Sequence, residues 1–187
     1  MQTLFIDKEI KYTGEQLSPH WIYKNFNIMG DAIVAFIGEC DVKLNHMVDI
    51  EDIINNEPIY SKKMLNIIEE NFHSSITEMV FKQRLLVTIT KELIEKNYPS
   101  VNITRSGDDL YINNRKLSVS IATKSITSTL IHFGLNITAE GAAINASDLL
   151  NDAGIKDIKE FALNILKNYN NEITDIIFAT SKVRGVF

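Results

Sequence analysis

Two segments of this chain carry most of the information about its fold. They are Asn113-Asn114-Arg115-Lys116-Leu117-Ser118-Val119-Ser120-Ile121 and, further along, His132-Phe133-Gly134-Leu135-Asn136-Ile137. In both segments bulky apolar residues alternate with small or polar ones, which is typical of a β-strand because successive side chains point to opposite faces. The pair Asn113-Asn114 is typical of a turn. We therefore expect a turn that leads into a strand, followed by a second strand of the same sheet.

Each of these strands has one face of small or polar side chains. In the first strand this face holds Ser118 and Ser120, and in the second it holds His132, Gly134 and Asn136. One interpretation is that both faces meet solvent, as antiparallel sheets commonly allow. The other is that the small residues let another group approach the backbone closely, so that the faces form the floor of a ligand site. The pattern alone leaves both interpretations open.

The rest of the chain shows strand and helix patterns in alternation. The apolar run Ala32–Ile37 predicts a strand buried on both faces, and Thr3–Ile6 with Glu9–Tyr12 predicts a small hairpin before it. After Pro99 the apolar period changes to two and predicts an antiparallel meander, with strands at Val101–Arg105, Leu110–Asn113, Lys116–Thr123 and Thr127–Ile137. Helical spacing predicts Pro58–Glu70, a long helix from the capping box Ser75-Ile76-Thr77-Glu78 to Pro99, Asp148–Ala153 and Lys156–Asn170.

Composition excludes several classes of protein. The 187 residues include 19 Lys and Arg against 24 Asp and Glu, a net charge of −5, whereas a sequence-independent nucleic-acid binder needs a cationic face. No apolar run approaches the roughly 18 residues of a membrane-spanning helix. Cys40 is the only cysteine, so there is no disulfide framework. Without a signal-peptide pattern we expect a cytoplasmic protein.

The order of the expected elements predicts the fold class. Runs of strands and runs of helices, rather than a regular alternation of the two, are typical of an α+β protein. We expect one domain over residues 1–187, with a central mixed, largely antiparallel sheet and helices on one side. A chain of this length buries roughly 70% of its unfolded surface, which is enough for a substantial core.

Arg115 and Lys116 are the first candidates for binding an anion. The planar fork of arginine and the compact charge of lysine both suit a carboxylate or a phosphate. In this hypothesis Arg115 and Lys116 neutralise the ligand, and hydrogen bonds from Ser118, Ser120, His132 and Asn136 orient it. The competing interpretation is that the Arg-Lys pair is an ordinary solvated surface feature.

Two further sites follow from other side chains. The pair His20-Trp21 can stack on a planar ligand, or the tryptophan can simply anchor a loop on the core. His46 and Asp49, close to two more acidic residues, have the chemistry of a divalent-cation site, to which Asp31 is an alternative. The competing interpretation of the acidic residues is that they precede a helical turn and favour its positive end.

The two segments quoted first resemble the catalytic sheet of the biotin and lipoate protein ligases. In those enzymes the lysine of a strand-turn-strand segment contacts the substrate carboxylate and the adenylate phosphate, and a later strand ends in Gly-x-Asn-hydrophobic, matched here by Gly134-Leu135-Asn136-Ile137. The resemblance implies a class II synthetase-like fold, Lys116 as the catalytic residue, and ATP with Mg²⁺ as cofactors. It also implies a homodimer paired through sheet edges.

Nearly the whole chain also resembles a family of archaeal and bacterial proteins defined only as a domain of unknown function. The segments that carry this resemblance are Tyr12-x-Gly14-x-x-Leu17, the strand after Gly30-Asp31, His46-Met47-Val48-Asp49 and the Arg115-Lys116 hairpin. We associate that family with the same class II synthetase-like fold. The resemblance brings no established activity with it.

Three hypotheses on function follow. The leading one is that a small carboxylate or nucleotide-linked ligand binds on the sheet floor, with acyl or adenylyl transfer as the associated chemistry. The second is a non-catalytic binding or assembly protein, because residues 42–52 are acidic where the ligases have a Gly- and Arg-rich adenylate loop. The third is a metal-dependent hydrolase centred on His46 and Asp49.

Overall fold

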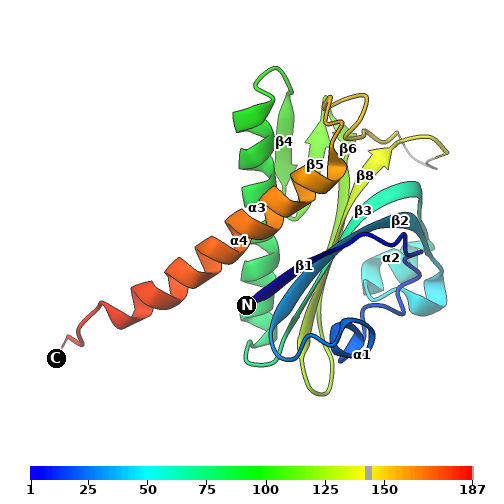
Figure 1. The fold of residues 1–187 in the computed structure, drawn as a ribbon. Coiled ribbons are helices and arrows are strands. Elements are labelled where there is room, and N and C mark those ends of the chain that lie inside the picture. The colour runs from blue at the N-terminus through cyan, green and yellow to red at the C-terminus, as the bar shows by residue number, and fades with distance from the viewer. Residues whose placement is uncertain (142–144, 187) are drawn as a thin grey trace.

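The computed structural model describes residues 1–141 and 145–186, and its centre is a five-stranded sheet (Figure 1). One outer pair of strands is parallel, and all other neighbouring strands are antiparallel. The strands, in spatial order, are β1 (Gln2–Ile6), β2 (Ala32–Val42), β3 (Ile59–Asn71), β8 (Thr129–Thr138) and β7 (Ser118–Lys124). The expected α+β class with a mixed, largely antiparallel sheet is confirmed.

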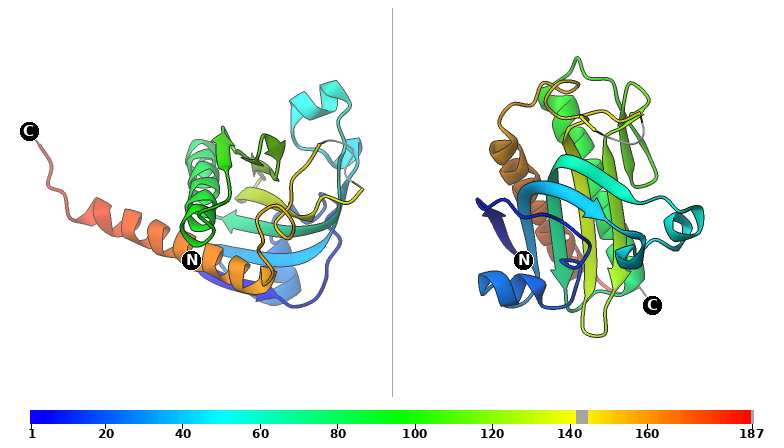
Figure 2. Two further views of the ribbon diagram at one scale, coloured as in Figure 1. Left: turned by 90° about the horizontal axis from the view of Figure 1, so that it is seen from above. Right: turned by 90° about the vertical axis from the view of Figure 1, so that its right-hand side faces the viewer.

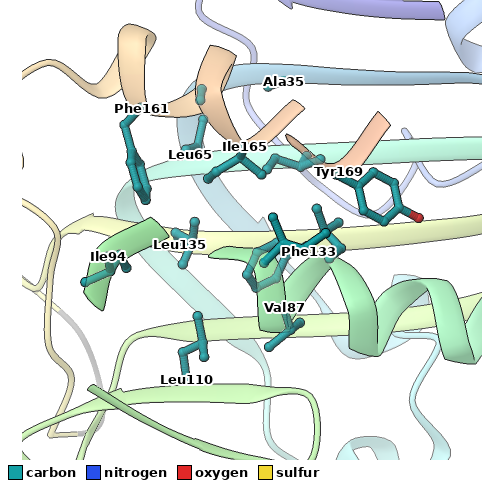
Figure 3. Packing of buried hydrophobic residues seen from close by; sticks show 14 of the residues in the cluster. Ala35, Leu65, Val87, Ile94, Leu110, Phe133, Leu135, Phe161, Ile165 and Tyr169 are labelled. Carbon is teal, nitrogen blue, oxygen red and sulfur yellow. The ribbon is translucent and has the colours of Figure 1, made fainter. Parts of the chain in front are cut away.

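Two long helices cover one face of this sheet. They are α3 (Ile76–Asn97) and α4 (Ile158–Ser181), which Figure 2 shows on the same side of the strands. The predicted capping box starts α3, because Ser75 Oγ accepts from the backbone N–H of Glu78 at 3.2 Å while the Glu78 carboxylate accepts from the N–H of Ser75 at 2.6 Å. The main apolar core lies between these helices and the strands (Figure 3).

A second, three-stranded sheet lies beside α3. Its strands are β4 (Ile103–Ser106), β5 (Asp109–Ile112) and β6 (Arg115–Lys116). The predicted continuous meander is therefore wrong, since the chain leaves the small sheet at Lys116 and enters the large one at Ser118. The break falls at Leu117, whose side chain is fully buried in the main core. This change of sheet fixes where Lys116 is presented.

The other face of the large sheet is covered by short elements only. These are the loop from residue 7 to residue 20, α1 (Trp21–Phe26), the 3₁₀ helix η1 (Leu44–His46) and α2 (Ile50–Asn55). In Figure 1, α2 stands on the opposite side of the sheet from α4. Cover on this face is incomplete, which leaves room for a cavity.

Four local predictions are wrong. Residues 59–70 lie in strand β3 rather than in a helix. Residues 64–71 are buried on both faces of the sheet, and the buried Asn66, Glu69 and Glu70 imitate the polar side of a helix. The expected N-terminal hairpin does not form, since β1 pairs in parallel with β2. Residues 148–153 form no helix and contain a turn at 149–152, and α4 continues to Ser181 instead of ending near Asn170.

Candidate functional site

A cavity of about 610 Å³ opens on the face of the sheet opposite α3 and α4. Its floor is formed by side chains of β3, β7 and β8, including Met64, Val119 and His132. Its walls come from Tyr12 and Leu17 in the N-terminal loop, from the segment that contains η1 and α2, and from the edge of the small sheet at residues 108, 109 and 116. The cavity is therefore apolar at its base and charged at its rim.

Lys116 is the cationic side chain of this rim. Its ammonium lies 2.9 Å from Asp109 Oδ2, and both side chains are about one-quarter to one-third exposed (32% and 23%). Burial opposes the charge on Lys116, but the hydrogen bond and charge of Asp109 outweigh burial and raise its pKa. Lys116 is therefore a charged group at neutral pH, held at the cavity wall by one carboxylate.

Asp52 on α2 is a second residue of the rim whose pKa is shifted. Burial, followed by the negative charge of Asp49, raises the pKa of Asp52, while Lys116 acts in the opposite direction. The same causes apply to Asp109, whose pKa is raised by burial and lowered in part by Lys116. Negative charge at this rim is consequently only partly compensated.

Tyr12 and His132 form a stacked pair at the base of the cavity. Their ring centroids are 3.7 Å apart with an interplanar angle of 12°, and each residue is only 3% exposed. His132 Nε2 lies 3.0 Å from Asn66 Oδ1, and the Asn66 amide donates to the carbonyl of Met64. Burial lowers the pKa of His132 to about 3, so the ring is neutral at physiological pH.

The position of Tyr12 depends on a glycine in β2. Residues 10 to 12 run along β2 through hydrogen bonds from the N–H groups of Ile10 and Tyr12 to the carbonyls of Ile37 and Glu39. A Cβ atom on Gly38 would lie 1.9 Å from the carbonyl oxygen of Ile10, so no larger residue fits there without moving the loop. This close approach carries the Tyr12 ring onto His132.

Asn136 and Lys116 are joined through the chain around residue 147. The Asn136 amide donates to the carbonyl of Ser147 at 3.3 Å, and the N–H of Ser147 donates to the carbonyl of Lys116 at 2.9 Å. Both Asn136 and Lys116 line the cavity together with His132. The structure thus brings these three predicted residues to one cavity, whose lining also includes the predicted Ser118, Ser120, His46 and Asp49.

Arg115 turns away from the cavity. Its guanidinium pairs with Asp152 and donates to the carbonyl of Ala146, and it is not among the residues that line the cavity. Lys116 points to the opposite side because neighbouring residues of a strand alternate faces. The side chain of Arg115 fastens the turn after Ser147 to β6.

Ser118 and Ser120 border the cavity, but their hydroxyl groups are engaged on the helix side of the sheet. Ser118 Oγ accepts from the N–H of Leu110, and Ser120 Oγ bonds to Gln83 Nε2 at 2.7 Å and to Asp108 Oδ2 at 3.0 Å. The register explains this, since Ser120 lies opposite Phe133, which points into the main core. The small faces of β7 and β8 therefore do not coincide.

His20 and Trp21 lie at α1, outside the cavity lining. The backbone N–H of His20 donates to Glu70 at 2.7 Å, and its ring lies 5.4 Å from that of Phe72. Trp21 packs against Phe36 of β2 and against Phe26 at the end of α1. In this position the tryptophan anchors α1 on the core, as the competing interpretation had it.

The candidate metal ligands are dispersed or engaged elsewhere. Asp49 is the N-cap of α2 and accepts from the N–H groups of Glu51 and Asp52, and the exposed His46 ends η1. Asp31 accepts from the Asn71 amide and the N–H of Phe72. Within residues 1–141 and 145–186, no three His, Cys, Asp or Glu side chains gather in a way that could hold a metal ion.

Several residues that line the cavity were not among the site residues predicted from the sequence. Tyr12 and Leu17 had a signal, because both lie in the Tyr12-x-Gly14-x-x-Leu17 segment of the family resemblance. Met64 had none, since residues 58–70 were expected to form a helix, and Glu57 stood in no motif of the sequence. Asp109 carries only the composition of a turn, and its role depends on the pairing of β5 with β6.

Comparison with known proteins shows the family. The model of the family Domain of unknown function (DUF366) matches residues 1–184. The chain belongs to this family. It is also 38% identical over 181 residues to the uncharacterized protein MJ0805 of Methanocaldococcus jannaschii, covering 94% of this chain and 81% of that protein.

Solved structures extend the comparison. A protein of unknown function from Pyrococcus horikoshi has a TM-score of 0.90 and 36% identity, covering 100% of this chain and 99% of the other. Biotin protein ligase from Aquifex aeolicus, in complex with biotin and ATP, has a TM-score of 0.61 at 15% identity, covering 92% and 70%. Protein Ta0514 from T. acidophilum, a putative lipoate protein ligase with bound lipoic acid, has a TM-score of 0.60 at 11% identity, covering 92% and 86%.

The two ligases, at these low identities, show the fold alone. The protein thus has the biotin/lipoate ligase-like, class II synthetase-like fold that the resemblance implied. None of the helices in the described ranges has the length and apolar character needed to cross a bilayer.

Proposed function

We propose that this protein binds a small carboxylate or a nucleotide-linked ligand in the cavity, with Lys116 contacting the anionic group. The observation that carries the proposal is the position of a charged lysine on the wall of a cavity of about 610 Å³. A cavity of this volume is within the range of small-molecule sites. Similarity to ligases that hold biotin, ATP or lipoic acid on the same fold supports the class of ligand.

The base of the cavity suits the non-anionic part of such a ligand. Met64, Val119 and Ile121 offer apolar surface, and the Tyr12–His132 pair offers aromatic surface. Burying an apolar body there removes it from water at a gain of roughly 25 cal/mol per Å². The ligand in this proposal is therefore amphipathic, with its anionic end at Lys116.

A thermal-shift screen tests the proposal, because a ligand that binds only the folded state raises the melting temperature. The panel contains ATP, AMP and GTP with and without Mg²⁺, and biotin, lipoate and octanoate. We expect at least one of these to stabilise the wild type and to lose its effect in Lys116→Gln. Lys124→Ala is the matched control, since Lys124 is an exposed lysine on β7 away from the cavity.

Two outcomes would contradict the proposal. Equal shifts in wild type and Lys116→Gln would remove Lys116 from the site, and no shift from any carboxylate or nucleotide would remove the ligand class. A shift from ATP with Mg²⁺ would next call for a pyrophosphate-exchange assay, which reports adenylyl transfer. Ligand binding without exchange would favour the alternative of a non-catalytic binding protein.

One observation favours that alternative. The segment that holds η1 and α2 occupies the rim of the cavity, and its side chains there include Asp49, Glu51 and Asp52. Carboxylates repel a triphosphate unless a cation intervenes. Adenylyl transfer on this chain would therefore need bound Mg²⁺, and we expect no binding of nucleotide in the presence of EDTA.

The homodimer remains part of the proposal. β1 is an outer strand of the sheet, and the end of α4 projects from the body (Figure 1), exposing Ile176, Ile177 and Phe178 to between 44% and 64%. A second copy of the chain would cover both features. Sedimentation velocity should give the mass of a dimer for the wild type and of a monomer for Phe178→Glu, and a monomeric wild type would contradict the proposal.

A further inference from the structure

The balance of charge around the cavity differs from what a purely anionic ligand requires. Among the described residues that line it, one lysine faces six carboxylates, which are Asp49, Glu51, Asp52, Glu57, Asp108 and Asp109. An anion that entered would meet Lys116 but would be repelled by most of the remaining rim. The rim as a whole attracts positive charge.

Half of these carboxylates already have partners. Asp49 caps α2, Asp109 pairs with Lys116, and Asp108 pairs with Arg84 at 2.9 Å. For Glu51, Asp52 and Glu57 no ion pair and no side-chain hydrogen bond is found in the part of the chain that the structure describes. These three belong to α2 and the turn that follows it. Unpaired negative charge is thus concentrated on one wall.

Asp52 is the most constrained member of that wall. It is half-buried, and the charges of Asp49, Glu57 and Asp109 raise its pKa further, while the charge of Lys116 acts in the opposite direction. A cation placed beside it would relieve this repulsion. A positively charged ligand group should therefore gain more binding free energy beside Asp52 than beside an exposed, isolated carboxylate.

The base of the cavity supplies an independent indication of a ligand. The Asn66 amide donates to the Met64 carbonyl, so its oxygen faces His132 and Nε2 must be the donor of that bond. His132 Nδ1 is then a free acceptor, and neither Nδ1 nor the Tyr12 hydroxyl has a hydrogen-bond partner among the described residues. No fully enclosed side-chain nitrogen or oxygen in these residues lacks a partner, so both atoms open to the cavity.

A bare metal ion does not explain this arrangement. No cluster of three or more potential ligands exists within the described ranges, because the carboxylates are spread along the wall instead of converging. A spread of negative charge above an apolar, aromatic base suits an organic cation, whose charge sits on a longer apolar body. The aromatic pair adds a polarisable surface for that body.

We propose that the ligand of this cavity is a small zwitterion, with an ammonium or guanidinium group at Asp52 and Glu57, an apolar body on Tyr12 and His132, and its anionic group at Lys116. This inference rests on the proposed function, because it concerns the same cavity, and it adds the positive charge. An amino-carboxylate with several methylene groups between its two charges is the simplest such ligand.

Four probes with the same six-carbon chain separate the contributions of charge. They are 6-aminohexanoate, hexylamine, hexanoate and hexanol, tested at neutral pH by thermal shift and by calorimetry. We expect 6-aminohexanoate to bind best and hexylamine to bind better than hexanol. If hexylamine and 6-aminohexanoate bind no better than hexanol and hexanoate, respectively, the inference is wrong.

Substitutions then assign each charge to a wall. Asp52→Asn should weaken binding of 6-aminohexanoate and hexylamine about tenfold and leave hexanoate unchanged or tighter, and Glu57→Gln should act in the same direction. Asp175→Asn, on the exposed end of α4, is the matched control and should change nothing. Unchanged amine binding in both Asp52→Asn and Glu57→Gln would overturn the inference.

The remaining outcomes distinguish this inference from the proposed function. If Lys116→Gln abolishes hexanoate binding while probes with an amino group bind no better than those without one, the proposed function stands and this inference fails. If hexylamine binding depends on Asp52 while Lys116→Gln has no effect on any probe, the cationic subsite stands and the role of Lys116 fails. Stabilisation by Mg²⁺ alone that is lost in Asp52→Asn would replace the organic cation by a metal.

Discussion

Neighbouring residues of β3 and β8 serve two very different faces of the same sheet. Leu65 and Phe133 are fully buried under α3 and α4 (Figure 3), whereas His132 lines the cavity and is bonded to Asn66 on that face. On the helix face the one buried carboxylate of β3, Glu69, is bound by Tyr169 and Lys82. On the cavity face, His132 Nδ1 and the Tyr12 hydroxyl have no hydrogen-bond partner among the described residues. Burial alone therefore does not distinguish the polar groups of the two faces, whereas the state of their hydrogen bonds does.

The helix face should carry most of the stability. Phe133→Ala removes a fully buried ring from the main core and should lower the free energy of unfolding by about 3–5 kcal/mol, the usual cost of such a cavity. Urea denaturation measures this loss. Ile121→Ala, a half-buried residue on the cavity face of the neighbouring strand, should cost less than half as much. Equal losses would show that both faces are packed alike.

The cavity face should control stability at acid pH through His132. Its pKa is about 3 in the folded protein, against about 6.5 when unfolded, so between these values the unfolded state binds the extra proton. The stability from the neutral ring is complete above pH 6.5 and is lost as the pH falls, by about 3 kcal/mol at pH 4.

The measurement is a comparison of denaturation at pH 7 and pH 4 for wild type and His132→Gln. The variant should lose less stability than the wild type over this interval, since the glutamine does not titrate. Glu69 acts with the opposite sign, because burial raises its pKa and its contribution is lost as the pH rises. Subtracting the free energy of unfolding of the variant from that of the wild type removes the contribution of Glu69. If the free energies of the two proteins changed in parallel with pH, the prediction would be contradicted.

On the helix face, the hydrogen bond between Tyr169 and Glu69 should contribute less to stability than the neutral His132 ring does at pH 7. Tyr169 is fully buried and its hydroxyl donates to Glu69 Oε2 at 2.6 Å. Tyr169→Phe leaves that carboxylate with Lys82 as its remaining side-chain partner and should cost about 1–3 kcal/mol at pH 7. Tyr23→Phe, at an exposed tyrosine, is the control and should be neutral. No loss in Tyr169→Phe would mean that water replaces the hydroxyl.

The sequence predicted those elements whose local pattern and environment agree. The apolar run of β2 is buried on both faces and the capping box starts α3, so the starts of both elements were predicted correctly, although β2 continues past Ile37 to Val42. Strand β3 was mistaken for a helix because Asn66, Glu69 and Glu70 are buried polar residues, which a pattern-based analysis assigns to solvent. Only their tertiary partners, such as Tyr169 and Ser128, show why they are inside.

The candidate site was predicted in part for a related reason. Lys116, His132 and Asn136 lie on segments whose strand pattern was clear, and the structure places them on one cavity. Whether Ser120 faces the same way depends on the register of β7 against β8, which no periodicity reveals. The acidic residues of segment 42–52 were visible in the sequence, but only the fold of α2 over the sheet shows that Asp49, Glu51 and Asp52 line the cavity.

Ser120→Ala, for which we expect the smallest change in stability, tests the register of β7 against β8. Ser120 Oγ bonds to Gln83 of α3 and to Asp108, so it ties the sheet to the helix instead of facing a ligand. Ser120→Ala should therefore lower the free energy of unfolding by about 1 kcal/mol, the net value of a typical hydrogen bond, and should leave the affinity for any cavity ligand within a factor of two. Asn136→Ala, on the cavity side of the adjacent strand, should do the reverse and reduce affinity more than stability. If Ser120→Ala weakened binding strongly at unchanged stability, the two small faces would coincide after all, and the division between a structural and a ligand-facing side of this sheet would have to be redrawn.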